Sequence, residues 1–296
     1  MEILTQKDID FFNTNGYCIA RNVFSPQEVT QLRKAIDSLK YSEEEKGNVQ
    51  WLRDNKARFF EGDILGKEGV ANLVFDSRIL SIAKQILGSR LVYFGESNFQ
   101  IGVSSRGFHR DNCDRQDPKA PDWREDYPLI KMGIYLQDHQ KYSGGLKVRA
   151  GSHLTSDFID PDSAEINNEK VGKGKNVDIA NKPGDVIFWS MREAHSANFV
   201  RCRFFPKLSL DPKWENRLEK RLPFLLEPKH KERMTVWITW GAPGPMLDRY
   251  IDYYIKRGDY VNHWQKSKYN AEVQKLADAN NVEIRKPILE YGSKFA

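Results

Sequence analysis

The spacing of apolar residues near the N-terminus predicts helices. Ser25, Pro26 and Glu28 carry the start signals of a helix: an N-cap hydroxyl, a proline at the first helical position and the acid of a capping box. Apolar residues then recur at helical spacing as far as Leu39, so that one stripe packs inward. The segment "DSRILSIAKQILGS" repeats this plan and stops at Gly88. We expect both helices to be scaffold.

From about Leu91 the period of the pattern changes to two. In "LIKMGIYLQ" one face of the expected strand is apolar, with Ile130, Met132, Ile134 and Leu136. The other face carries Lys131, Gly133, Tyr135 and Gln137. Similar short runs, rich in β-branched and aromatic residues, recur as far as "RMTVWITWG" at 233–241. This pattern predicts a β-sandwich or barrel that carries N-terminal helices.

Helical spacing returns in "PMLDRYIDYYIKRG" at 245–258, and no linker precedes it. The chain length of 296 residues fits one large domain or two ordinary ones. Because no linker is seen, we expect a single domain over 1–296. It would consist of a helical N-terminal part with short strands at 1–88, a barrel core at about 89–243 and a helical C-terminal extension at 246–296.

Composition and charge narrow the classes of partner. The 46 basic and 41 acidic residues are interspersed and give a net charge of +5, which argues against a nucleic-acid partner. This mild charge is compatible with an anionic small substrate. No stretch approaches the ~18 uninterrupted apolar residues of a membrane span, and no signal peptide is recognised, so we expect no membrane partner. Monomer and homodimer both stay open.

Cysteine usage indicates a reducing compartment. Cys18, Cys113 and Cys202 are widely spaced and form no CxxC pair. A disulfide framework is therefore not expected, and the cytoplasm is the predicted location.

A His-x-Asp triplet, His109 and Asp111, follows a strand-like run, and His195 opens another such run. Two imidazoles and one carboxylate leave coordination positions open, which is the arrangement that non-haem Fe(II) oxygenases require. Asp114 is an alternative carboxylate ligand. The four other histidines are interpreted as turn residues or as solvated side chains: His139, His153, His230 and His263.

The motifs around these residues resemble the phytanoyl-CoA dioxygenase family of Fe(II)/2-oxoglutarate oxygenases. The resemblance rests on "HRD" at 109–111, "GIYLQDHQKYSGGLKVRAGSH" at 133–153, "KPGDVIFW" at 182–189 and the distal His195. It covers roughly Asp8 to Ile255. It implies a mainly β fold with α-helices: a double-stranded β-helix, which is a jelly-roll or cupin-like barrel, backed by N-terminal helices.

The resemblance also implies the cofactors and the reaction. Fe(II) would be held by His109, Asp111 and His195, with 2-oxoglutarate and O₂ as co-substrates. The reaction would oxidise, by default hydroxylate, a small-molecule metabolite and release succinate and CO₂. Desaturation or oxidative cyclisation by the same class stays open, as do a zinc hydrolase and a non-catalytic barrel that binds a metal or ligand.

In this family a basic residue on the last barrel strand holds the far carboxylate of 2-oxoglutarate. Arg233 opens the run "RMTVWITWG" and is our first choice; Arg203 is the alternative. The spacing between the distal histidine and this basic residue is longer here than is usual in the family, because the insertion 204–232 separates His195 from the strand. By analogy, Gln100 and Asn98 are expected as secondary contacts. We also expect Lys131, on the polar face of its strand, to line the cavity.

Overall fold

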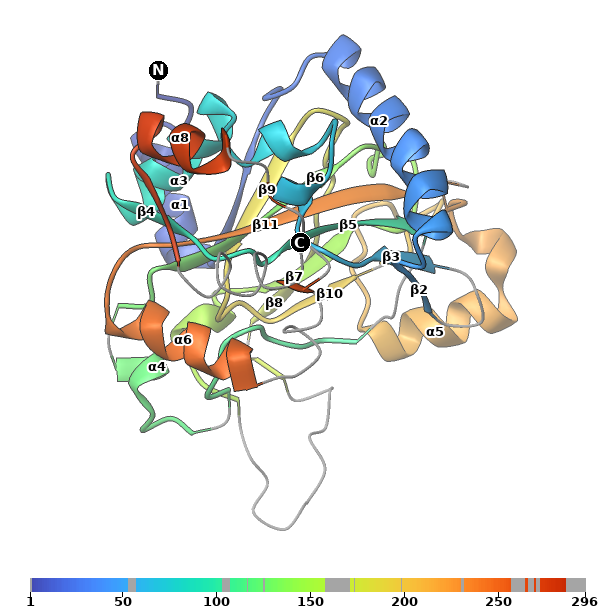
Figure 1. Ribbon diagram of the computed structural model, residues 1–296. Helices are drawn as coiled ribbons and strands as arrows, with labels where there is room; N and C mark the ends of the chain where they lie inside the picture. Colours follow the sequence, from blue (N-terminus) through green and yellow to red (C-terminus); the bar gives the residue numbers. More distant parts are fainter. Residues whose placement is uncertain are drawn as a thin grey trace.

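Two β-sheets form the framework, and most helices lie outside the larger one (Figure 1). The structure is a computed structural model. It describes residues 2–52, 57–102, 107–115, 117–124, 126–157, 171–172, 174–197, 199–229, 232–256, 264–265, 269 and 272–285.

The large sheet has nine strands among the described residues. The main path, in spatial order, is β1 (Tyr17–Ala20), β9 (Val186–Ser190), β6 (Leu129–Tyr135), β11 (Met234–Gly241), β5 (Ser97–Gly102), β3 (Ala57–Phe60) and β2 (Val49–Leu52). Off this path, β4 (Leu91–Tyr93) pairs with β11, and β12 (Val282–Ile284) runs parallel to β4. The three-stranded sheet has the order β10 (His195–Ala197), β7 (Leu146–Ala150) and β8 (Lys175–Asp178).

The described helices include the three located from the sequence: one starts after Ser25, one ends before Gly88 and one lies within 245–258. In chain order, the helices are α1 (Gln6–Asn15), α2 (Pro26–Glu45), α3 (Ser77–Leu87), α4 (Pro121–Arg124), α5 (Pro212–Arg221), α6 (Pro245–Lys256) and α8 (Glu272–Ala279). Both hydrogen bonds of the Ser25–Glu28 capping box are present at the start of α2, and Gly88 caps α3.

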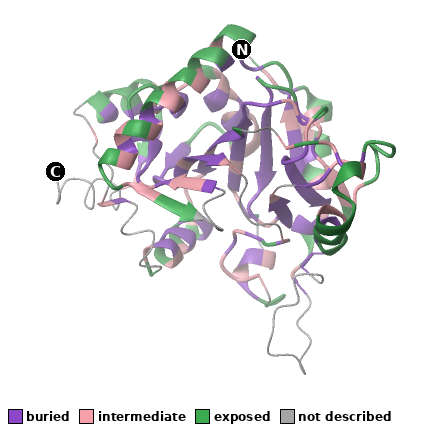
Figure 2. Cartoon of the chain, turned by 90° about the vertical axis from the view of Figure 1, so that its right-hand side faces the viewer, coloured by how far each residue is buried: buried purple, intermediate pink, exposed green. Residues whose placement is uncertain are grey.

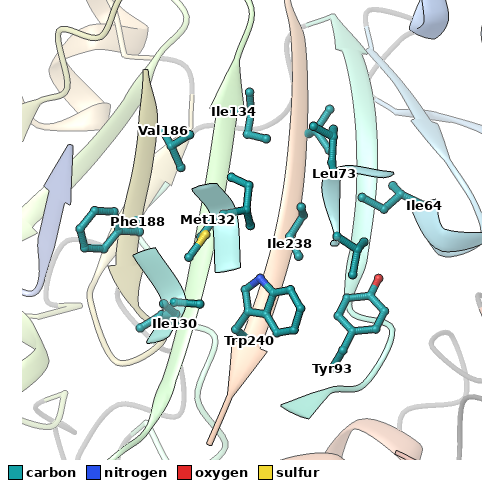
Figure 3. Packing of buried hydrophobic residues seen from close by; sticks show 14 of the residues in the cluster. Ile64, Leu73, Tyr93, Ile130, Met132, Ile134, Val186, Phe188, Ile238 and Trp240 are labelled. Atoms are coloured by element: carbon teal, nitrogen blue, oxygen red, sulfur yellow. The ribbon is translucent and has the colours of Figure 1, made fainter. Parts of the chain in front are cut away.

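The main core lies between the outer face of the large sheet and the helices, and Figure 3 shows its central part. Ile130, Met132 and Ile134 of β6 point into it, as their alternation predicts. The opposite face of the large sheet packs against the small sheet, through residues such as Tyr135, Leu146 and Trp189. Figure 2 shows the same division, with buried strands inside and exposed helix faces outside. This two-sheet arrangement confirms the predicted jelly-roll class.

Strands at both ends of the chain add to the expected division. Within 1–88, β1 pairs with β9, and the hairpin of β2 and β3 extends the sheet beyond β5. Near the C-terminus, β12 joins β4, so that the extension is not purely helical. The large sheet therefore extends beyond the expected core of 89–243. The single domain itself stays a prediction.

The described helices include none with the length and apolar content that crossing a bilayer requires. All three cysteines are free.

Candidate metal centre

Backbone pairing brings the two predicted histidine ligands side by side. The amide of His109 donates to the carbonyl of His195, and the amide of His195 donates back, each at 2.9 Å. On its other side, His195 is in register with Val148 of β7. The two imidazole centroids consequently lie 4.2 Å apart, although 86 positions separate the residues in the chain.

Asp111 completes the cluster. Its Oδ1 lies 3.9 Å from Nε2 of His109, and its Oδ2 lies 3.6 Å from Nε2 of His195. One ligand atom from each residue falls within 4.8 Å of the others, and this is the group in the described part of the chain that fits a metal ion. The three side chains thus meet as the sequence predicts, and their role as metal ligands stays a prediction.

The hydrogen bonds of both imidazoles leave Nε2 available to a metal. Nδ1 of His195 lies 3.0 Å from the carbonyl oxygen of Glu193, and Nδ1 of His109 lies 3.3 Å from that of Gly107. A carbonyl oxygen only accepts, so each Nδ1 carries the proton. Nε2, with its free lone pair, then points toward Asp111.

Burial and neighbouring charges keep His195 and Asp111 in their metal-binding protonation states. Burial lowers the pKa of His195 to about 3; His109 adds to the shift and Asp111 opposes it. Burial alone would raise the pKa of Asp111, but Lys131 and the two imidazoles outweigh it and hold that pKa below its usual range. A neutral imidazole and an ionised carboxylate are the forms that ligate a metal.

Lys131 of β6 supports Asp111 from behind. Its Nζ lies 3.0 Å from Oδ2 of Asp111 and 2.9 Å from Oε1 of Glu96. Glu96 is buried and also accepts a hydrogen bond from the hydroxyl of Tyr250 on α6, at 2.9 Å. Burial raises the pKa of Glu96, and Asp111 adds to the rise while Lys131 opposes it. The cluster is thus connected to α6 through Lys131 and Glu96.

A cavity of about 250 Å³ opens beside the three ligands, between the two sheets. Its polar lining includes Lys131, Glu96 and Asn98, the last two from the region of β5. Its aromatic lining comes from several elements: Phe59, Tyr135, Trp189, Trp237 and Tyr254. A cavity with apolar walls and a few converging polar groups is typical of a small-molecule site.

Arg233 is fully buried next to β11 and has an unusual environment. Its Nε donates to the carbonyl of Gly144 at 2.6 Å, its Nη1 donates to the carbonyl of Gly102 at 3.1 Å, and its guanidinium lies over the ring of Tyr135. Nη2 has no hydrogen-bond partner, and no carboxylate within the described ranges lies within ion-pair distance. Burial lowers the pKa of this arginine, against the opposing effect of Tyr135.

Other polar atoms near Arg233 also lack partners. Thr235 of β11 faces Gln100 of β5 in register, and Oγ1 of Thr235 and Nε2 of Gln100 are both buried without a hydrogen bond. Asn98 lines the cavity two residues before Gln100, and its Oδ1 is likewise unpaired. Buried polar atoms that remain unsatisfied indicate a missing ligand or water.

The structure separates the remaining candidates from the cluster. The side chain of Arg203 is 48% exposed, and its Nε donates to the carbonyl of Leu226. Asp114 pairs with Arg249 instead of joining the histidines. His139 and His153 are buried hydrogen-bonding residues beside turns, as predicted. His230 and His263 lie outside the described residues.

Sequence reasoning missed Glu96, Phe59 and Tyr254. Glu96 directly precedes β5 in a run that is typical of a strand, and no signal in the sequence shows that its carboxylate turns toward Lys131. Phe59 and Tyr254 come from the β2–β3 hairpin and from α6, outside the expected barrel core. Helical spacing predicts that Tyr254 packs in the core. It does so, but it also lines the cavity.

Comparison with known proteins identifies relatives of this chain. The family model described as phytanoyl-CoA dioxygenase matches residues 12–201. The ectoine dioxygenase of Nocardia farcinica is 30% identical over 155 residues, which are 50% of this chain and 51% of that protein. The chain spans about half the length of several curated relatives that it matches.

Solved structures of similar fold extend over most of the chain. HygX from Streptomyces hygroscopicus, with nickel, 2-oxoglutarate and hygromycin B bound, is 17% identical with a TM-score of 0.56, covering 81% of this chain and 88% of that one. The non-haem α-ketoglutarate-dependent carbocyclase SnoK from nogalamycin biosynthesis is 18% identical with the same TM-score, covering 81% and 84%. At this identity, the likeness concerns the fold.

Proposed function

Because the chain belongs to the phytanoyl-CoA dioxygenase family, we propose that it is an Fe(II)/2-oxoglutarate-dependent dioxygenase that oxidises a small-molecule metabolite. The observation that carries this proposal is the convergence of His109, Asp111 and His195 on one point at the wall of a cavity. The default reaction is hydroxylation with release of succinate and CO₂; desaturation and oxidative cyclisation are the alternatives within the class.

The donor set fits ferrous iron. Two neutral imidazole Nε2 atoms and one carboxylate leave the remaining coordination positions for co-substrates, whereas structural zinc sites are closed by four protein ligands. Iron bound here would supply the redox chemistry and the O₂ activation. The contribution of this chain would be to fix the ligand geometry and to surround the site with aromatic walls that limit access of water.

We propose that Arg233 holds the far carboxylate of 2-oxoglutarate. A buried guanidinium with an unpaired Nη2 and no acidic partner in the described structure is suited to a carboxylate supplied by a ligand. Gln100 and Thr235 would complete this subsite with their unsatisfied atoms. Arg203, half exposed and bonded to a backbone carbonyl, is less suited to the role.

In this proposal Lys131 positions a metal ligand. Its ammonium contacts Asp111 and Glu96, so it is placed to orient the Asp111 carboxylate toward the metal. Contact with the co-substrate stays a prediction for Lys131 and for Asn98. Because this ammonium already contacts two carboxylates, its surroundings do not favour the anionic substrate that the net charge suggests.

With three free cysteines, we retain the proposal of a reducing cytoplasm.

The test has two steps. Anaerobic addition of Fe(II) and 2-oxoglutarate should give a visible metal-to-ligand charge-transfer band, which His195→Ala should abolish. Candidate metabolites, beginning with ectoine because the relatives are ectoine dioxygenases, are then screened for substrate-dependent release of succinate. Tight Zn²⁺ binding without that band would refute the oxygenase proposal.

A further inference from the structure

Exposed apolar side chains concentrate in one short segment. Of the eleven large hydrophobic residues that are exposed in the described part of the chain, six lie within 204–224. They are Phe204, Phe205, Leu208, Trp214, Leu222 and Phe224. The three phenylalanines are 65–71% exposed. A soluble chain rarely exposes so many large apolar groups together, unless they meet a partner.

The segment is anchored firmly, so this exposure does not come from a loose loop. Glu215 of α5 is fully buried, and its Oε1 lies 3.1 Å from Nζ of the buried Lys147 and accepts from the amide of Val200. Asp211 caps α5 and pairs with Arg149 at 3.0 Å. Glu215 and Asp211 thus face inward, onto the small sheet.

Local pairing places the aromatic residues on the outside of this anchor. The amide of Arg203 donates to the carbonyl of Leu225, next to an antiparallel bridge between Cys202 and Leu226. These contacts join the chain just before Phe204 to the chain just after Phe224. On α5, which forms the outer margin of the molecule in Figure 1, the guanidinium of Arg217 lies 4.7 Å from the ring of Trp214.

The exposed charges of the same segment have one sign. Within 203–224 the charged residues classed as exposed are all cations: Arg203, Lys207, Lys213, Arg217, Lys220 and Arg221. The third acid of the segment, Glu219, is partly buried and pairs with Lys229. Although the net charge of the whole chain is mild, the exposed surface of 203–224 is therefore both aromatic and basic.

We propose that this surface, formed by the exposed residues of 203–224, binds peripherally to an anionic lipid membrane. Aromatic side chains favour the headgroup boundary, and Lys and Arg are attracted to anionic lipids. Self-association about a twofold axis would place cations against cations, which argues against a second copy as the occupant. The sequence-based expectation of no membrane partner rests on the lack of a spanning segment, and peripheral binding needs none. This inference is independent of the proposed catalysis.

The test is co-sedimentation of the full chain with vesicles of phosphatidylcholine, with and without about one quarter phosphatidylserine. Binding is expected with the anionic vesicles and should weaken as salt rises from about 0.1 to 0.5 M. Each cation near such a surface contributes about 1 kcal/mol, or roughly fivefold in partitioning. The triple variant Lys213→Glu/Lys220→Glu/Arg221→Glu, which removes three cations and adds three anions, should therefore lose at least about 100-fold.

The aromatic residues are tested with matched controls. Phe204→Ser/Phe205→Ser/Phe224→Ser should lower partitioning at least tenfold, whereas Phe11→Ser/Tyr41→Ser/Leu154→Ser, which changes exposed apolar residues elsewhere, should not. Circular dichroism checks that both variants are folded. Equal binding to neutral vesicles, an equal loss in the control, or a dimer in light scattering that the first variant dissociates would overturn the proposal. So would binding to polyglutamate but not to vesicles, which would identify an acidic polypeptide as the partner.

Discussion

Replacement of Arg233 by glutamine isolates the proposed co-substrate anchor. The guanidinium is fixed by the carbonyls of Gly144 and Gly102, which leaves Nη2 for a ligand. Glutamine has an amide that can still donate to one of these carbonyls, so the variant removes the charge and the free donor without emptying the site. Alanine would leave both carbonyls unpaired and would mix a folding defect with a binding defect.

The magnitude depends on the number of free donors. A charge-assisted hydrogen bond contributes roughly 1.5–3 kcal/mol. Loss of the one bond that Nη2 is free to make corresponds to about a 10- to 150-fold rise in the dissociation constant of 2-oxoglutarate, since 1.4 kcal/mol is a factor of ten. Metal binding should change little, because Arg233 does not contact the three ligands.

The assay is anaerobic titration of the Fe(II)-loaded protein with 2-oxoglutarate, followed through the charge-transfer band, with Mn²⁺ affinity measured separately by calorimetry. Arg203→Gln is the matched control and should behave as the parent protein, because that side chain is half exposed. Unchanged 2-oxoglutarate affinity in Arg233→Gln, or an equal loss in Arg203→Gln, would refute the reasoning.

Three further predictions concern the surrounding residues. Loss of a residue that only supports a metal ligand lowers metal affinity by roughly 10- to 100-fold. Asp111→Ala removes a proposed ligand itself and should lower Mn²⁺ affinity in calorimetry by more than this, while Asp114→Ala should not change it. Lys131→Met leaves Glu96 buried without its cation and should cost about 3–5 kcal/mol in urea unfolding of the metal-free protein; adding Glu96→Gln should recover part of this loss, and no recovery would contradict the pairing. Burial raises the pKa of Asp63 against hydrogen bonds from Ser97, Tyr93 and Tyr269, so the folded state keeps a proton that the unfolded state loses above about pH 4. The contribution of Asp63 to the free energy of unfolding therefore falls as pH rises above about 4. Relative to the parent protein, Asp63→Asn should become more stable between about pH 4 and 7. A difference in urea midpoints that stays constant over this range would contradict the raised pKa.

Local patterns were sufficient to predict the scaffold. The capping box at Ser25 and the alternation along β6 depend on residues a few positions apart, and both are found as predicted. The convergence of the three candidate ligands was predictable for another reason. Their residue types admit few alternatives, and the motifs between His109 and His195 fix which strand ends meet.

The surroundings of the ligands depend on pairings that sequence does not display. Lys131 belongs to an alternating strand whether its ammonium meets solvent, a co-substrate or Asp111, and the choice is made by β5 and α6 packing beside it. The pattern of 195–205 predicts a longer strand, yet β10 covers only His195–Ala197. Beyond β10 the chain passes through α5 before it reaches β11, because buried Glu215 and Lys147 dock that segment on the small sheet.

Arg233 shows why this insertion leaves the proposed chemistry intact. The distal histidine and the arginine are 38 positions apart in the chain, but His195 begins β10 and Arg233 directly precedes β11. Both strands pair with strands that precede the insertion. The inserted residues form α5, which packs on the small sheet through Glu215 and Lys147. The insertion therefore does not displace Arg233, which lies in the interior beside Tyr135. A buried guanidinium without an acid is costly to folding by itself. It is retained where a ligand supplies the missing charge, and such a ligand then stabilises the folded state by an amount that rises with the logarithm of its concentration relative to the dissociation constant.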